Sequence, residues 1–319
     1  MTGLKPTVSP THIILMLAGL TLSGHSNASL KQRVIDRAMA EHASTLVSNE
    51  LITIRRNIPF GTDPRQQFDV YLPTQQSNPK NTMPWIFMVH GGAWRLGDKA
   101  HDNVVDNKVK HWVPKGMVLV SSNYRLLPKA DPLTQAQDLA KALANVQKSA
   151  ASYGIDAQQC LIMGHSAGAH LAALLAVSPK LLKAAGATPC LGAVLIDSAA
   201  MNLPSVMQRR HAAFYDQAFG NQPTYWRTVS PMDQMTKAVI PLLTICTARH
   251  DDACDQAKAL TDQAKTLSSK PSDYTWFKLS LSHEQANEQL GLIGPYTNAV
   301  DRFIAERSDQ FAEVINRRE

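Results

Sequence analysis

A serine between two glycines is the first candidate for chemistry in this chain. Gly164, Ser166 and Gly168 form the pattern G-x-S-x-G, which follows an apolar run and precedes a segment rich in Ala and Leu. In that context the serine sits on a sharp strand-to-helix turn that exposes its hydroxyl, and side chains at either glycine would collide. A helix N-terminus beneath it favours developing negative charge. Ser166 is therefore the predicted nucleophile, and the alternative is a glycine-rich turn with a solvated serine.

Two adjacent glycines after an earlier apolar run could stabilise an oxyanion. Gly91 and Gly92 follow His90 directly, and a backbone with two glycines can approach a ligand closely and direct N–H groups toward it. With the N–H of Ala167 they would form an oxyanion hole, in which one donor is worth about 10²–10³ in rate. Without the serine motif, a tight turn that needs positive φ would be the preferred interpretation of this pair. His90 is expected to brace that loop.

A reactive serine also needs a histidine to take its proton and a carboxylate to orient that histidine. His283 lies just after the last apolar run, and Asp252 follows the apolar run before it. We therefore predict Asp252 as the acid and His283 as the base. Asp251 and Asp197, the latter at the end of a still earlier apolar run, are alternative acids. Each aspartate could instead cap a helix.

The elements expected around these residues alternate between strands and helices. Strands are predicted at 51–57, 68–72, 85–89, 117–121, 160–163, 193–196, 242–246 and 274–279, and helices at 29–46, 104–113, 133–152, 168–177, 253–267 and 296–306. Antiparallel strands followed by repeated βα units predict one open, mostly parallel sheet with helices on both faces. Ligands of such sheets bind at the carboxyl ends of the strands, where the candidate residues lie.

These residues resemble the α/β-hydrolase superfamily, in particular the esterase branch with an H-G-G-x-W oxyanion loop. That branch includes hormone-sensitive-lipase-like carboxylesterases, feruloyl-esterase-like and kynurenine-formamidase-like hydrolases. The matching stretches are residues 68–73, 90–94, 123–126, 164–168 and 282–284. The resemblance implies the α/β-hydrolase fold, and it implies these roles: nucleophile Ser166, acid Asp252, base His283, and an oxyanion hole on Gly91, Gly92 and Ala167. The sequence after Asp252 departs from the family's D-x-x-V-P pattern, which keeps Asp251 as an alternative.

The expected activity is hydrolysis of a small-molecule carboxylic ester through an acyl-enzyme, with no cofactor and no metal. An arylformamidase or amidase is the alternative enzyme, and a non-catalytic binding module is a weaker one. Residues 201–235 hold several aromatic side chains that could form a small lid or pack on the sheet. Nucleic acid is not an expected partner: the net charge is +6, from 32 basic and 26 acidic residues, and the basic residues are scattered.

The first 28 residues have the pattern of a secretory signal peptide. Lys5 precedes an apolar run at 13–22, and small residues follow at Ser26 and Ala28. The run is too short to span a bilayer, so stable membrane insertion is not expected. The prediction is therefore an exported, periplasmic or secreted protein, with the hydrolase domain at 29–319. In an oxidising compartment the four cysteines favour two disulfides, and the local pairing is Cys160–Cys190 with Cys246–Cys254. Free buried thiols are the alternative.

Overall fold

The structure is a computed structural model that describes residues 51–75, 82–237, 239–248 and 251–317, apart from the side chain of Asp251. The predicted signal peptide at 1–28 and the helix expected at 29–46 lie outside these residues. The start of the hydrolase domain at residue 29 therefore stays a prediction.

An eight-stranded sheet runs through the described residues, in the order β1-β2-β4-β3-β5-β6-β7-β8. The strands are β1 (Ile52–Pro59), β2 (Gln67–Pro73), β3 (Met83–Val89), β4 (Val118–Ser122), β5 (Ile155–His165), β6 (Gly192–Ile196), β7 (Leu242–Thr247) and β8 (Tyr274–Leu279). β2 pairs antiparallel with both β1 and β4, and all other neighbours are parallel. This confirms the predicted open, mostly parallel sheet.

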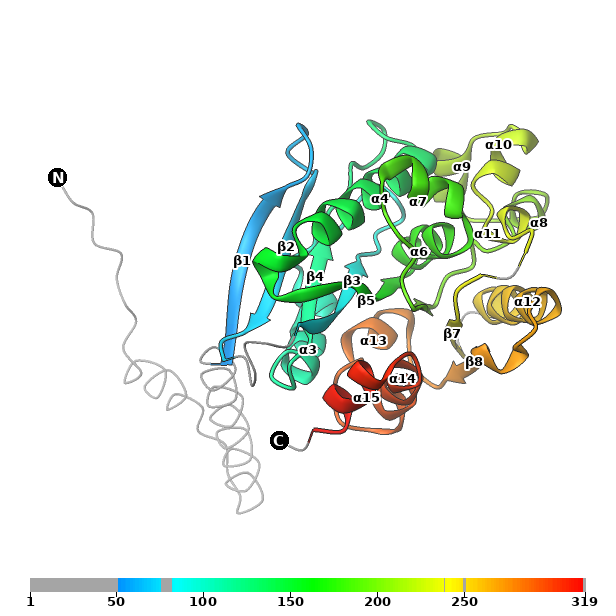
Figure 1. Ribbon diagram of the computed structural model, residues 1–319. Helices are drawn as coiled ribbons and strands as arrows, with labels where there is room; N and C mark the ends of the chain where they lie inside the picture. The colour runs from blue at the N-terminus through cyan, green and yellow to red at the C-terminus, as the bar shows by residue number, and fades with distance from the viewer. Residues whose placement is uncertain (1–50, 76–81, 238, 249–250, 318–319) are drawn as a thin grey trace, which may run out of the picture. The chain divides into compact units, whose positions relative to one another are not determined.

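Helices cover both faces of the sheet (Figure 1). One face carries α3 (Asp102–Trp112), α13 (His283–Glu288), α14 (Pro295–Ala305) and α15 (Asp309–Ile315). The other carries α4 (Pro132–Lys148), α5 (Ala150–Tyr153), α6 (Ala167–Val177), α7 (Pro179–Ala185) and α12 (Asp251–Leu267). Because both faces are covered, β3 is apolar throughout: Trp85 and Phe87 face one core, and Ile86 and Met88 the other.

The segment between β6 and β7 folds into four short helices. These are α8 (Leu203–Met207), α9 (Ala213–Phe219), α10 (Pro223–Thr228) and α11 (Pro231–Gln234). A proline stands in the first turn of α8, α10 and α11, where its missing N–H costs no hydrogen bond. These four helices were not among the elements predicted above.

The observed boundaries differ from the predicted ones where local signals were ambiguous. The helix expected at 133–152 ends at Lys148, and a separate turn, α5, ends at Gly154 in a left-handed conformation. The chain then enters β5, which begins at Ile155, five residues before the predicted start at residue 160. None of the helices in the described part of the chain is long and apolar enough to cross a membrane.

Both predicted disulfides are present. Cys160–Cys190 joins β5 to the residues just before β6, and Cys246–Cys254 joins the end of β7 to the first turns of α12. The pairing is the local one expected from the sequence. The second disulfide lies at the carboxyl end of the sheet, where ligands of such folds bind.

Candidate active site

Ser166 occupies the turn between β5 and α6 with φ of 57° and ψ of −124°, a conformation that costs a non-glycine residue about 1–3 kcal/mol. Its N–H donates to the carbonyl of Ile196, 2.9 Å away, which helps to hold the turn. The flanking glycines are required by close backbone approach. A Cβ on Gly164 would lie 2.3 Å from the carbonyl oxygen of Gly168, and one on Gly168 would lie 2.3 Å from that of Val89. This is the geometry predicted for a nucleophile elbow.

His283 is the first residue of α13, and its imidazole lies against a carboxylate. Ser282 caps this helix and forms a capping box with Gln285. The capping box fixes the backbone position from which the His283 side chain projects. The Nδ1 of His283 donates to Oδ2 of Asp197 over 2.7 Å. A carboxylate can only accept, so Nδ1 carries the hydrogen and Nε2 is the nitrogen able to take up a proton.

Asp197 follows β6 directly and is buried. Besides His283, it accepts from the N–H of Thr247 at 2.8 Å and from the hydroxyl of Thr247 at 2.9 Å. Burial raises the pKa of this carboxyl, but the hydrogen bonds from His283 and Thr247 outweigh burial and bring the pKa below its ordinary value. Asp197 is therefore held as an anion oriented toward the imidazole.

The predicted acid, Asp252, does not contact His283 in this way. It lies in the first turn of α12, its side chain is 65% exposed, and it forms an ion pair of 3.0 Å with Arg209. The side chain of the alternative Asp251 lies outside the described residues. The structure thus brings His283 to Asp197, which the sequence had ranked below Asp252. The reason is spatial: β6 lies next to the nucleophile strand β5 in the sheet, so its end is close to the reactive turn.

One cavity of about 920 Å³ joins all of these groups. Ser166, His283 and Asp197 line it together with Asp252. The backbone of the predicted oxyanion hole, at Gly91, Gly92 and Ala167, lines the same cavity. Apart from the alternative Asp251, the candidate residues named from the sequence therefore border one space at the carboxyl ends of the strands.

The oxyanion loop approaches Ser166 closely. A Cβ on Gly91 would lie 3.0 Å from the Cβ of Ser166 and 2.9 Å from the carbonyl of His165, so a side chain there would displace the reactive turn. Gly92 has a φ of 121°, a conformation that favours glycine. Ala167 is the first residue of α6, where backbone N–H groups have no partner within the helix. Such amides are suited to bind a developing oxyanion.

Comparison with known proteins places this architecture in a family. The family model BD-FAE matches residues 68–264. The chain belongs to the BD-FAE family. This match confirms the predicted resemblance to the esterase branch of the α/β-hydrolases, and the structural neighbours share the fold. Esterase B of Lactobacillus rhamnosis has a TM-score of 0.63 at 20% identity, over 90% of this chain and 96% of that one. A carbohydrate esterase from gut microbiota has a TM-score of 0.64 at 18% identity, over 82% and 98%.

The curated relatives of this BD-FAE chain match over shorter stretches. A probable isoprenylcysteine alpha-carbonyl methylesterase of Arabidopsis thaliana is 32% identical over 133 residues, which are 42% of this chain and 26% of that protein. A kynurenine formamidase of Salmo salar is 30% identical over 120 residues, 37% of each chain. The chain therefore spans well under half the length of these relatives. Their activities concern ester and formamide bonds, both of them carboxyl derivatives.

His165 directly precedes Ser166 in the chain. In this BD-FAE chain its ring lies 4.4 Å from that of His283, centroid to centroid. Its Nε2 donates to the backbone carbonyl of His283 over 2.9 Å. Burial, with a smaller contribution from the neighbouring His283, lowers the pKa of His165 to about 3, so the ring is neutral at ordinary pH. His165 therefore holds α13 against the nucleophile turn without adding a charge to the cavity.

Aromatic residues from the segment between β6 and β7, called the insertion below, contribute to the lining of the cavity. Phe214 and Tyr215 of α9 line it, whereas Phe219 and Trp226 are buried beneath. Trp94 of the oxyanion loop packs on Phe219, with ring centroids 4.7 Å apart. Phe219 and Trp226 therefore pack in the core, and the lid stays a prediction. Within the described residues, no group of three or more His, Cys, Asp or Glu is arranged to hold a metal ion.

Proposed function

We propose that this chain is a serine hydrolase that cleaves carboxylic esters through an acyl-enzyme, with Asp197 rather than Asp252 as the acid. The observation that carries the proposal is the 2.7 Å hydrogen bond from His283 Nδ1 to Asp197, in the cavity that Ser166 lines from its strained turn. Family membership supports a hydrolase of the esterase type. The serine, histidine and acid roles come from the chemistry of these side chains.

In the proposed reaction, Ser166 Oγ attacks the ester carbonyl while His283 Nε2 takes its proton. Asp197 stabilises the imidazolium that forms, and backbone N–H groups of Gly91, Gly92 and Ala167 stabilise the oxyanion. The tetrahedral intermediate collapses, and His283 returns the proton to the leaving alcohol. Water, deprotonated by His283, then attacks the acyl-enzyme and releases the acid and Ser166.

The walls of the cavity favour an acyl or aryl group of modest size. Phe214 and Tyr215 contribute aromatic side chains to the cavity lining, and Asp98 and Asn103 contribute polar ones. A cavity of about 920 Å³ accommodates a small-molecule substrate. We therefore propose aryl esters, or esters of short to medium acyl chains. A formamidase reaction would use the same groups, and the formamidase relatives make it the second candidate.

The experiment that tests this function measures kcat/KM on 4-nitrophenyl esters of graded acyl length, a feruloyl ester and N-formyl aromatic amines. The Ser166→Ala variant should lose activity by roughly 10⁴-fold or more on every substrate that the wild type hydrolyses. A fluorophosphonate should add one label to the wild type, seen by intact-mass spectrometry, and none to the variant. Equal hydrolysis by Ser166→Ala would refute the proposal. Activity on formamides but not on esters would select the second candidate.

A further inference from the structure

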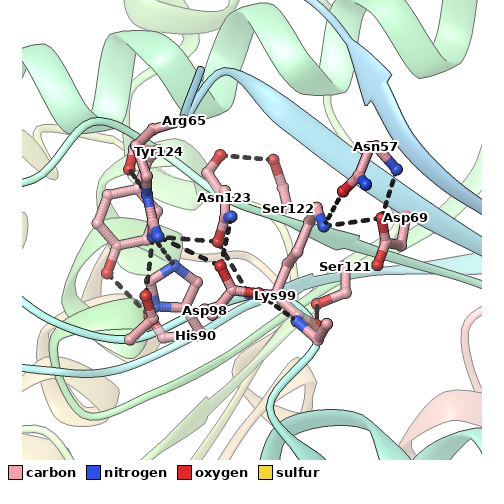
Figure 2. A network of polar contacts seen from close by, with 12 residues as sticks. Asn57, Arg65, Asp69, His90, Asp98, Lys99, Ser121, Ser122, Asn123 and Tyr124 are labelled. Atoms are coloured by element: carbon pink, nitrogen blue, oxygen red, sulfur yellow. Dashed lines mark hydrogen bonds and ion pairs between the residues drawn. The ribbon is translucent and has the colours of Figure 1, made fainter. Parts of the chain in front are cut away.

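Arg65, in the turn between β1 and β2, lies behind the oxyanion loop. Its guanidinium donates to the carbonyl of Gly97 at 2.8 Å and to the side chains of Asn123 at 3.1 Å and Asp98 at 3.2 Å. Figure 2 shows these groups converging on it, with His90 on the same side. Arg65 is not among the residues that line the cavity. Its contacts therefore act on the loop and not on a bound substrate.

The contact between Arg65 and His90 determines which nitrogen of the imidazole carries the hydrogen. Arg65 Nη2 lies 3.3 Å from His90 Nε2, and a guanidinium can only donate, so Nε2 must accept. Nδ1 then carries the hydrogen and donates to the carbonyl of Gly91, 2.7 Å away. Burial lowers the pKa of His90 to about 4, and the charge of Arg65 acts in the same direction. The ring is therefore neutral with its hydrogen on Nδ1.

The surroundings of His90 leave this ring no second orientation. It is fully buried and stacks on Tyr124, with centroids 4.5 Å apart, and the hydroxyl of Tyr124 donates to the carbonyl of His90 at 2.9 Å. A Cβ on Gly97 would lie 2.4 Å from His90 Nδ1 and 2.3 Å from the carbonyl oxygen of Gly91. The backbone at Gly97 thus closes the space behind the His90–Gly91 hydrogen bond.

Holding the carbonyl of Gly91 also directs the next N–H. In a trans peptide the C=O and N–H point in opposite directions, and the cis peptide among the described residues is at Leu127–Pro128. Because the carbonyl of Gly91 points back toward His90, the N–H of Gly92 points away from it. Gly91 and Gly92 line the cavity together with His90, so the N–H of Gly92 lies at the cavity wall.

We propose that Arg65 is a positioning residue for the oxyanion hole: it fixes the Nδ1–H tautomer of His90, and His90 holds the Gly91–Gly92 peptide with its N–H directed at the substrate oxygen. This inference rests on the proposed serine-hydrolase function. The loss of Arg65 lets His90 place its hydrogen on Nε2, which turns Nδ1 into an acceptor facing the carbonyl of Gly91. The peptide then loses the bond that orients it, and transition-state stabilisation falls while ground-state binding does not.

The test compares Arg65→Met with Arg56→Met. Arg56 is a matched control because its guanidinium pairs with Asp69 at 3.3 Å, with no contact to His90 or Gly97. Arg65→Met should lower kcat about 10–100-fold and leave KM within about twofold. The loss is smaller than the factor of about 10²–10³ for a whole oxyanion donor, because the Gly92 N–H would be misdirected and not removed. Affinity for an aryl trifluoromethyl ketone, which forms a tetrahedral adduct with the serine, should fall by the same factor. Millimolar guanidinium chloride, but not sodium chloride, should restore part of kcat, and Arg56→Met should match the wild type.

A double-mutant cycle with His90→Phe separates this role from general support of the fold. Phe keeps the stack on Tyr124 but cannot hold the carbonyl of Gly91, so Arg65→Met should add little to the loss in that background. If Arg65→Met does not fold, Arg65→Lys, which keeps one donor and the charge, should show an intermediate kcat. An unchanged kcat, a loss in KM alone, or a full additional loss in the His90→Phe background would overturn the inference. If Ser166→Ala stayed active, the proposed function itself would fail instead.

Discussion

The two sides of the cavity are held in different ways. On the oxyanion side, the loop after β3 rests on a network that is mostly buried: Lys99 forms a 2.8 Å ion pair with Asp69 of β2, and its N–H donates to Asn123. Both side chains of that ion pair are almost completely inaccessible to solvent. Figure 2 shows this network continuing from Asp69 to Arg65. The loop is thereby tied to the sheet itself.

On the acid–base side, the contacts among the described residues join the ends of separate strands. Thr247, at the end of β7, donates twice to Asp197, at the end of β6, and His283 follows β8. The Cys246–Cys254 disulfide lies next to Thr247, and the ion pair between Arg209 and Asp252 is exposed. An oxyanion hole draws on several fixed dipoles, whereas the proposed proton transfer depends on one imidazole, His283, which Asp197 orients. The comparison therefore predicts that single changes on the acid–base side have the larger effects.

The largest effect is expected from Asp197→Asn. An amide cannot stabilise the imidazolium, and it can donate to Nδ1 and so favour the wrong tautomer of His283, which should lower kcat by about 10²–10⁴. Asp252→Asn is the matched control, because it removes a carboxylate on the same cavity whose exposed ion pair contributes little. Its kcat should stay within about threefold of the wild type on an aryl ester. The reverse ranking would restore Asp252 as the acid.

An intermediate effect is expected from removing the disulfide on the acid–base side. The Cys246→Ser/Cys254→Ser variant frees the end of β7 beside Thr247 and should lower kcat several-fold, and also lower the free energy of unfolding by about 2–3 kcal/mol. Cys160→Ser/Cys190→Ser removes the other disulfide, in which Cys190 precedes β6 whereas Asp197 follows it, so this disulfide lies at the other end of that strand. It should cost about 3–4 kcal/mol of stability and leave kcat unchanged for the folded fraction. Urea titration measures the free energy of unfolding, and ester hydrolysis measures kcat. Equal losses of kcat in the two variants would contradict a special role for the second disulfide.

The same contrast explains what the sequence could predict. The nucleophile turn and the glycine loop are local: Gly164, Ser166 and Gly168 must stand together because backbones approach there, so the pattern is visible in a few adjacent residues. The sheet, its two helical layers and both disulfides followed from local apolar runs in the same way. The proposed acid was not visible in a local pattern. Asp197 and His283 are 86 residues apart, and three aspartates stand at suitable strand ends. Arg65 gave no signal, because its role depends on a turn that folds back onto the end of β3.

The smallest effect concerns His165, which links the two sides of the cavity. The unfolded chain protonates this residue near the ordinary pKa of about 6.5, whereas in the native protein burial lowers its pKa to about 3. As the pH falls from 6.5 toward 3, the unfolded state therefore binds a proton that the native state does not, and stability is lost by about 1.4 kcal/mol per pH unit. His165→Phe keeps a ring against His283 but removes this titration. Urea unfolding between pH 4 and pH 6.5 should show a shallower fall in stability for the variant, by about one proton. The pKa of His90 is also lowered, to about 4, but His90 is present in both the wild type and His165→Phe. It therefore does not change the difference between their pH slopes. An equal slope in both would mean that His165 is already protonated in the native cavity, and its neutral contact with His283 would then be wrong.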